Sequence, residues 1–148
     1  MNFYEVKVEY TRQTGEDNPK SVKESYMTWE VNFGRAEQLV HDYLKQYAAD
    51  LVTTLSMKIL KVYDKFQMNE GKAHIYCGKV KFITIDDNGT ERSIVNRVYV
   101  GADSLSEAKE FLHERYKDYD AELVGIEETK MLEFVDVFQQ LSNGKEKR

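Results

Sequence analysis

The sequence predicts an α+β fold made of two copies of a strand–strand–helix–strand unit. Residues 4–66 align on residues 76–138 without a gap, at a constant offset of 72 and with 15 identities among 63 positions. Each half also begins with strict alternation of polar and apolar residues, which is typical of a half-buried strand. Later in each half, apolar residues recur at helical spacing. Because a fixed period can decide the whole architecture, we interpret the chain as an internal duplication.

In the first half, alternation predicts a strand over Phe3 to Tyr10, and the returning strand is expected over Ser21 to Val31. Asn32 follows and is a good N-cap, since its side-chain oxygen can accept from the free amides of a first helical turn. Helical spacing of apolar residues then continues to Tyr47. A third strand is expected over residues 51–60.

The second half repeats this order. A strand is expected over Tyr76 to Phe82, followed by a turn at residues 86–89, where Asn-Gly is a strong hairpin signal because both residues tolerate positive φ. The returning strand spans Ser93 to Val100. Ser104 is the N-cap of the second helix, and residues 123–132 form the last strand.

The expected assembly is about six strands in antiparallel sheets with two packed helices, related by pseudo-twofold symmetry in one compact domain. The first unit spans residues 1–66, a linker 67–72, the second unit 73–140, and a flexible tail 141–148. Units of about 70 residues bury little apolar surface alone, so we expect a shared core. The pattern leaves open whether the units share one sheet or form two facing sheets.

Composition predicts a soluble, cytoplasmic protein. The chain is 41% hydrophobic and 32% charged, without an apolar run long enough for a membrane span. Its N-terminal residues alternate in polarity and do not resemble a secretory signal. Cys77 is the single cysteine, which excludes an intrachain disulfide and a cysteine-based zinc site. The net charge of -5 argues against a surface devoted wholly to nucleic acid.

Two histidine-containing pairs are candidates for chemistry. His41 and His113 occupy equivalent places in the two halves, but neither helix supplies further ligands at the spacing of a metal site. His74 and Cys77 could form a nucleophile and base, yet residues three apart in a strand point to opposite faces. Ordinary structural roles are the favoured interpretation of all four residues.

The acidic turn at residues 86–91 resembles a calcium loop only superficially. Counting from Thr84 places Gly89 at the required sixth position, but the twelfth is Val95 instead of a bidentate glutamate. A tight hairpin turn explains these residues better. No metal or other cofactor is therefore expected.

A surface is the remaining candidate site. Alternation places basic and aromatic residues on the side of the strands that faces away from the helices, with Met27 in phase with Trp29. The candidate residues are Phe3, Lys7, Met27, Trp29, Lys79, Lys81, Arg97 and Tyr99. Such a face could stack bases and hold phosphates, as single-strand binders do. Alternatively, the face could bind a protein partner or a second copy of the chain, and we favour the interpretation that Met27, Trp29 and Tyr99 pack between the two units or in a homodimer.

Several features favour the protein partner. Glu5 and Glu9 share the face of the first strand, and no Lys/Arg-Gly-Phe/Tyr motif of RNA-recognition folds is present. A phosphate-binding glycine loop and a Gly-x-Ser-x-Gly elbow are also missing from the sequence. We therefore expect a non-enzymatic interaction protein, with single-stranded nucleic-acid binding as the alternative function.

Four segments of the chain resemble an uncharacterised family, domain of unknown function 4494. They are residues 3–10, residues 76–82, the Ala-Asp-Ser-Leu-Ser-Glu-Ala run at 102–108 and the Asp-Val-Phe ending at 136–138. Members of that family occur in gut bacteria and in their phages and mobile elements, so the resemblance implies a small intracellular accessory protein. It implies no catalytic residue and no cofactor.

Overall fold

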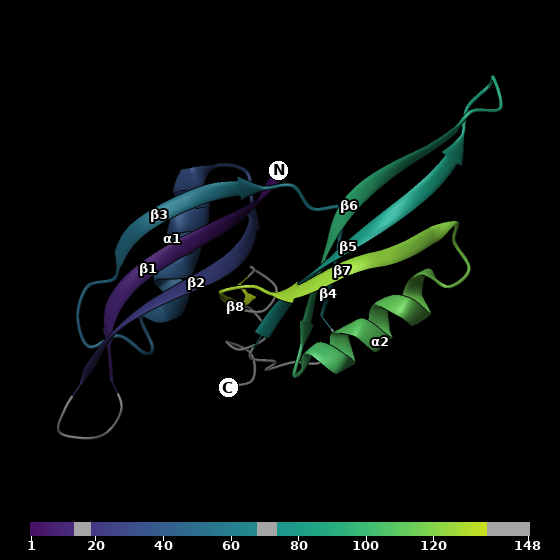
Figure 1. The fold of residues 1–148 in the computed structure, drawn as a ribbon. Coiled ribbons are helices and arrows are strands. Elements are labelled where there is room, and N and C mark those ends of the chain that lie inside the picture. The colour runs from purple at the N-terminus through teal and green to yellow at the C-terminus, as the bar shows by residue number, and fades with distance from the viewer. Residues whose placement is uncertain (14–18, 68–73, 136–148) are drawn as a thin grey trace, which may run out of the picture. The chain divides into compact units, whose positions relative to one another are not determined.

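A computed structural model describes residues 1–13, 19–67 and 74–135. Within these residues the fold is α+β, with two helices and eight strands in two mixed four-stranded sheets (Figure 1). The prediction of two helices is confirmed. The prediction of about six antiparallel strands is wrong, because each sheet gains one short strand in parallel orientation.

The chain divides into two compact units, which we call unit 1 and unit 2. Unit 1 contains Met1–Leu60 together with Met131–Arg148, and unit 2 contains Lys61–Lys130. These boundaries differ from the expected units of residues 1–66 and 73–140. Nearly all of the expected linker, residues 68–72, and the expected tail, residues 141–148, lie outside the described residues.

Unit 1 has the sheet order β3-β1-β2-β8 with one helix. Its elements are β1 (Asn2–Arg12), β2 (Lys20–Glu30), α1 (Phe33–Leu44), β3 (Thr53–Leu60) and β8 (Met131–Phe134). Strands β1, β2 and β3 pair antiparallel, as expected, whereas β8 runs parallel to β2.

Unit 2 has the sheet order β4-β6-β5-β7 with one helix. Its elements are β4 (Asp64–Gln67), β5 (His74–Ile85), β6 (Glu91–Ala102), α2 (Leu105–Tyr116) and β7 (Ala121–Glu128). Strands β5, β6 and β7 pair antiparallel, and β4 runs parallel to β6.

The last strand expected in the second half, residues 123–132, is broken at Thr129. Its backbone amide and its hydroxyl both donate to the carbonyl oxygen of Ile75, at 2.9 and 2.7 Å. Strand β7 has ended at Glu128, and the chain resumes as β8 in the sheet of unit 1. An apolar run that continues across the break hides it from sequence reasoning.

Both predicted N-caps are confirmed. The side-chain oxygen of Asn32 accepts from the amide of Arg35 at 2.9 Å, and the Ser104 hydroxyl accepts from the amide of Glu107 at 3.1 Å. These bonds satisfy amides that have no partner within the helix. They fix where each helix starts, and the apolar stripe then determines which face packs on the sheet.

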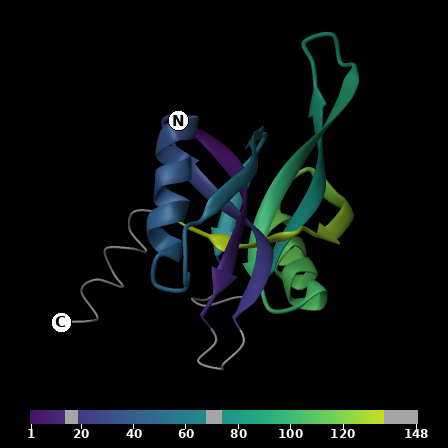
Figure 2. The same cartoon turned by 90° about the vertical axis from the view of Figure 1, so that its left-hand side faces the viewer.

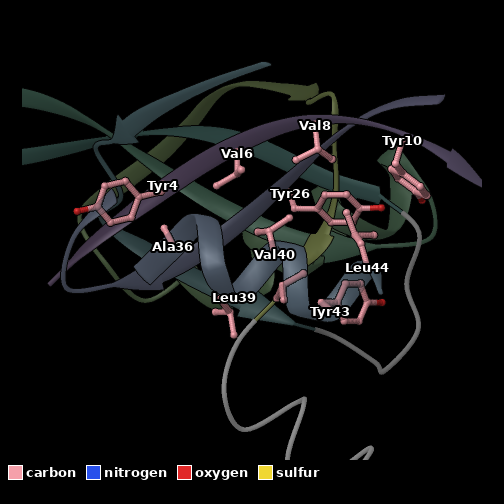
Figure 3. Close-up of a cluster of buried hydrophobic side chains, with 11 residues drawn as sticks. Tyr4, Val6, Val8, Tyr10, Tyr26, Ala36, Leu39, Val40, Tyr43 and Leu44 are labelled. Carbon is pink, nitrogen blue, oxygen red and sulfur yellow. The ribbon is translucent and has the colours of Figure 1, made fainter. Parts of the chain in front are cut away.

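Each helix covers one face of its own sheet. In unit 1 the buried cluster joins alternate residues of β1 to the apolar stripe of α1, as Figure 3 shows. Its members are Tyr4, Val6, Val8, Tyr10, Tyr26, Ala36, Leu39, Val40, Tyr43, Leu44 and Val135. The cluster in unit 2 comprises Tyr76, Val80, Val98, Val100, Ala102, Ala108, Leu112 and Tyr116. Each of these two buried clusters lies within a single unit.

The β5–β6 hairpin extends beyond its neighbouring strands, as both views show (Figures 1 and 2). Strand β7 pairs with β5 only as far as Phe82, and β4 pairs with β6 only over Val98–Gly101. We call residues 83–95 the hairpin arm. At its turn the carbonyl of Asp86 accepts from the amide of Gly89, which has φ 76°. Among the described residues only this glycine has positive φ, so Asn88 does not adopt the conformation expected for it.

Candidate functional site

The eight residues proposed from the sequence belong to two different units. Unit 1 contains Phe3, Lys7, Met27 and Trp29, whereas unit 2 contains Lys79, Lys81, Arg97 and Tyr99. Each group occupies one face of its own sheet, opposite the helix. We therefore treat the two groups as separate surfaces.

The surface of unit 1 is aromatic at one end. Phe3 lies opposite Trp29 in the β1–β2 register, with 6.2 Å between the ring centroids. Trp29 is 49% exposed, so its ring is accessible to solvent. Met27 shares this phase, but it is fully buried. Met27 is therefore not accessible on this surface.

The charges on the unit 1 surface are largely balanced. Glu5 pairs with Lys58 at 3.2 Å, and Glu9 lies 4.0 Å from Lys23. Lys7 is exposed, with Ser25 and Ser56 as its cross-strand neighbours. Because carboxylates alternate with the cations along β1, this surface does not offer a continuous positive track for phosphates.

The surface of unit 2 is more basic. Lys79 on β5 lies directly opposite Arg97 on β6, and Lys81 follows on the same face. We call these three residues the basic group. Within the part of the chain that the structure describes, none of them has a carboxylate at ion-pair distance. Like charges directly opposite on a sheet are destabilising, so this arrangement favours an anion from outside.

Tyr99 and Cys77 lie on the same face of the sheet, next to the basic group. They face each other across β5 and β6, and Tyr99 is only 5% exposed, so its ring is not accessible for stacking. Burial raises the pKa of Tyr99 to about 12. Burial also raises the pKa of the Cys77 thiol above its usual value, which disfavours a nucleophilic thiolate.

His74 does not support Cys77. Its Nδ1 atom lies 2.8 Å from a carboxylate oxygen of Glu128, and its ring is 6.3 Å from that of Tyr76, a core residue on the helix side of the sheet. Cys77 belongs to the opposite face, so the argument from strand geometry is confirmed. This pair does not form a nucleophile with its base.

The two equivalent histidines have different surroundings. His41 Nε2 lies 2.7 Å from the hydroxyl oxygen of Thr54, on the neighbouring strand β3. His113 lies at the rim of a cleft of about 440 Å³ between α2 and β7. The cleft has an apolar floor and a polar rim, lined by Val80, Leu112, His113, Tyr116, Lys117, Ala121, Glu122 and Leu123. Within the described ranges, no three histidine, cysteine or carboxylate side chains are placed to hold a metal ion.

The acidic turn is a structural element of the hairpin arm. One carboxylate oxygen of Asp86 accepts from the amides of Asn88 and Thr90, at 3.0 and 2.9 Å, and the other accepts from Arg92 Nε at 3.2 Å. The Asp86 side chain, at the third position of the calcium-loop count, thus stabilises the turn.

Sequence reasoning missed a polar network at one end of the unit 1 core. The hydroxyls of Tyr10 and Tyr26 donate to the same oxygen of Glu24, at 2.5 and 2.8 Å. Arg12 donates to the Tyr10 oxygen at 3.0 Å and lies 3.4 Å from the second oxygen of Glu24. Nearby, the hydroxyl of Tyr43 donates to a Glu133 oxygen. A signal was available, because Glu24 shares the inward phase of its strand.

This network is structural. Figure 3 shows Tyr10, Tyr26 and Tyr43 at one end of the cluster and Tyr4 at the other. Burial, followed by the hydrogen bond to Glu24, raises the pKa of Tyr26 well above its ordinary value of 10.0. A tyrosine in this state is a poor base at neutral pH. Its hydroxyl instead satisfies a partly buried carboxylate, which would be costly to leave unpaired.

These tyrosines make stability depend on alkaline pH. A group whose pKa is raised on folding contributes stability that is complete below its unfolded value and is lost as pH rises through its folded value. The pKa values of Tyr10, Tyr26 and Tyr43 are all raised from 10.0. We expect the free energy of unfolding to fall above about pH 10, by about 1.4 kcal/mol per pH unit for each such tyrosine.

Urea unfolding measured from pH 8 to 11 tests this expectation. In Tyr26→Phe the slope should decrease by about one proton, whereas Tyr63→Phe, which changes an exposed tyrosine of unit 2, should leave it nearly unchanged. A slope that is the same in Tyr26→Phe and in the wild type contradicts the assignment.

Comparison with known protein families gives one result. A family model described as Domain of unknown function (DUF4494) matches residues 2–140. The chain belongs to the DUF4494 family. The resemblance drawn from the sequence is thereby confirmed, and the DUF4494 match spans both units. The comparison with curated proteins finds no match.

The helices of this DUF4494 chain do not point to a membrane span. Neither helix in the described ranges combines the length and the apolar character that crossing a membrane would require.

Proposed function

We propose that the chain is a non-enzymatic interaction protein that binds a protein partner, or a second copy of itself, through a sheet surface. The hairpin arm carries this proposal. Three branched aliphatic side chains are exposed there, namely Ile85 at 72%, Ile94 at 57% and Val95 at 52%. Ile85 and Val95 lie on the face opposite α2 and Ile94 on the other face, so both sides of this projecting element are apolar, which is characteristic of interaction sites. Such a role fits the accessory function that the family resemblance implies.

The arm also has little support from the rest of its unit. Its β5 part, from Ile83 to Ile85, pairs only with Glu91 to Ser93 of β6 among the described strands. A two-stranded hairpin is marginally stable in water. Binding would cover its apolar side chains and stabilise it, so an interaction surface accounts for a feature that packing within unit 2 does not explain.

Replacing the three exposed side chains with threonine tests the proposal. Threonine keeps the β-branched shape that strands favour but removes part of the apolar surface. For Ile85→Thr/Ile94→Thr/Val95→Thr we expect at least a tenfold loss of association, since each buried aliphatic side chain contributes about 1.5 kcal/mol or more. Val124→Thr, at a similarly exposed position on β7, should have little effect.

Association is measured in two ways. Sedimentation velocity of the purified chain detects self-association, and a photoreactive residue at position 95 detects a partner in cells that naturally express the chain. A true partner crosslink is competed by purified wild-type chain and not by the triple variant. The proposal fails if the chain stays monomeric and no crosslink is competed. It also fails if the chain turns over a substrate in a hydrolase panel and Cys77→Ala abolishes that turnover.

Binding of single-stranded nucleic acid is the second candidate. The observation in its favour is the unpaired basic group, in which Lys79 lies opposite Arg97. Against it, Tyr99 is buried, and the accessible ring of Trp29 belongs to unit 1, on a surface whose charges are balanced. An oligonucleotide is therefore included as a competing ligand in the experiment described below.

A further inference from the structure

We infer that the partner is an acidic protein segment in extended conformation, which adds as a strand along the open edge of β6 and places carboxylates on the basic group. This inference rests on the proposed function and specifies the chemistry of its partner. It combines three observations on unit 2: an unpaired strand edge, exposed aliphatic side chains, and cations without carboxylate partners.

The edge of β6 is open along half its length. Strand β4 occupies Val98–Gly101, and the amide of Tyr63 donates to the carbonyl of Arg97 at 2.9 Å. From Glu91 to Asn96, β6 is hydrogen-bonded to β5 alone among the described strands. Backbone donors and acceptors along such an edge can pair with an extended peptide, which is a common mode of peptide recognition.

The corresponding stretch of β2 in unit 1 differs in sequence from the open edge of β6. Residues 20–24 precede the short partner strand β8, just as residues 92–96 precede β4 in the pairing of β6. In β2 this stretch reads Lys-Ser-Val-Lys-Glu, and lysines on an edge discourage further pairing. In β6 it reads Arg-Ser-Ile-Val-Asn, with the isoleucine and the valine exposed. The open edge of β6 therefore lacks the protection found in β2.

The basic group sets the charge of the partner. Val95 lies opposite Lys81 and shares the face of Lys79 and Arg97, so apolar and cationic side chains are adjacent on one surface. The acidic residues on this face are Glu122 and Glu127 of β7, opposite Lys81 and Cys77, and Glu91 of β6, opposite Ile85, and none of them pairs with Lys79 or Arg97. A strand that alternates acidic and aliphatic residues would place its carboxylates on the face of this like-charge pair and its aliphatic side chains on the opposite face, where Ile94 is exposed.

The side chains beside the basic group favour protein over nucleic acid. The exposed residues of the arm on this face are Ile85, Val95, Ser93 and Glu91, none of them aromatic, and the aromatic residue of the face, Tyr99, is buried. Binders of single strands need accessible rings on which bases stack. A surface of cations and branched aliphatics fits carboxylates and aliphatic side chains better.

The test uses a fluorescein-labelled peptide of four Glu-Val repeats as the acidic probe. Matched probes replace glutamate with glutamine or lysine, and an eight-residue oligothymidine represents nucleic acid. Fluorescence anisotropy with the full chain should show the acidic peptide binding at least tenfold more tightly than the glutamine peptide. Its affinity should fall as salt is raised, because partly exposed charges are screened.

Charge-reversal variants locate the site. Lys79→Glu/Arg97→Glu should weaken binding of the acidic peptide at least tenfold, and Lys109→Glu, on the exposed face of α2, should not. Hydrogen exchange on the wild-type chain gives a second measurement that does not depend on a variant folding. Those amides from Glu91 to Asn96 that point away from β5 should become protected when the acidic peptide is bound.

The outcomes separate this inference from the function beneath it. If the glutamine and acidic peptides bind equally and both respond to the threonine substitutions in the arm, the acidic partner is wrong and the interaction function stands. If oligothymidine binds and the acidic peptide does not, nucleic acid is the ligand and the inference is overturned. It is also overturned if no peptide binds, or if the amides of residues 91–96 exchange at unchanged rates.

Discussion

Replacing Glu24 with alanine should lower the free energy of unfolding of unit 1 by about 3 kcal/mol. The carboxylate accepts from the hydroxyls of Tyr10 and Tyr26 and lies 3.4 Å from Arg12. Its side chain is only 15% exposed, so water replaces these bonds poorly. Alanine would leave two tyrosine hydroxyls without their acceptor and a guanidinium without its anion. Such orphaned groups account for the large expected cost.

The chain offers a convenient probe and graded controls for this prediction. Its single tryptophan, Trp29, belongs to unit 1, so fluorescence during urea unfolding follows that unit. Glu24→Gln keeps an oxygen that can accept from both tyrosines but loses the charge, and should cost about 1 kcal/mol. Glu9→Gln, on the opposite face with a 4.0 Å contact to Lys23, should change stability by less than about 0.5 kcal/mol. If Glu24→Ala proves as mild as Glu9→Gln, the network does not stabilise the core.

The sequence revealed those parts of the fold that are encoded locally. Alternation over Phe3 to Tyr10 and the caps at Asn32 and Ser104 are signals within a few residues, and the structure confirms them. Strands β4 and β8 are different, because each has four residues and pairs in parallel with a strand distant in sequence. So short a segment has no readable period, and parallel pairing leaves no local turn signal.

The same distinction applies to the candidate site. Period-two phase correctly placed Lys79, Lys81 and Arg97 on one face, because it follows from strand geometry alone. Phase does not reveal whether a face is covered, and it could not decide whether Met27 and Tyr99, which are buried, would be exposed. The extent of the hairpin arm was also hidden, since it depends on where neighbouring strands end.

The polar network of unit 1 is not repeated in unit 2 at the 72-residue offset. Glu24 of the polar network is matched at the 72-residue offset by Asn96, and Tyr10 by Phe82. Unit 1 thus uses this end of its sheet for a hydrogen-bonded network, whereas unit 2 has an aromatic contact between Phe82 and Tyr63, at 4.9 Å. Strand β6 has no such network and carries the exposed residues Ile94 and Val95 in this region.

Replacing Gly78 with alanine should lower the free energy of unfolding of unit 2 by about 2 kcal/mol. A Cβ atom at this position would lie 2.4 Å from Leu112 Cδ1 and 3.3 Å from Leu123 Cδ1. Leu112 belongs to α2 and is buried in the cluster between this helix and its sheet, so its side chain has little room to move. Gly125→Ala is a matched control on β7, because its Cβ would meet only Lys79 atoms at 3.8 Å and beyond. We expect that control to change stability by less than about 0.5 kcal/mol.

A compensating substitution distinguishes steric overlap from the general effect of adding a side chain to a strand. At the 72-residue offset, Val6 and Val40 replace the glycine–leucine pair of Gly78 and Leu112, so unit 1 combines a larger strand residue with a smaller helix residue. Leu112→Val alone should cost about 1 kcal/mol by opening a cavity, but combined with Gly78→Ala it should recover part of the loss. Hydrogen exchange in β5 measures this in unit 2, where Trp29 gives no signal. Strictly additive costs would show that Gly78 is not required by the close approach of Leu112.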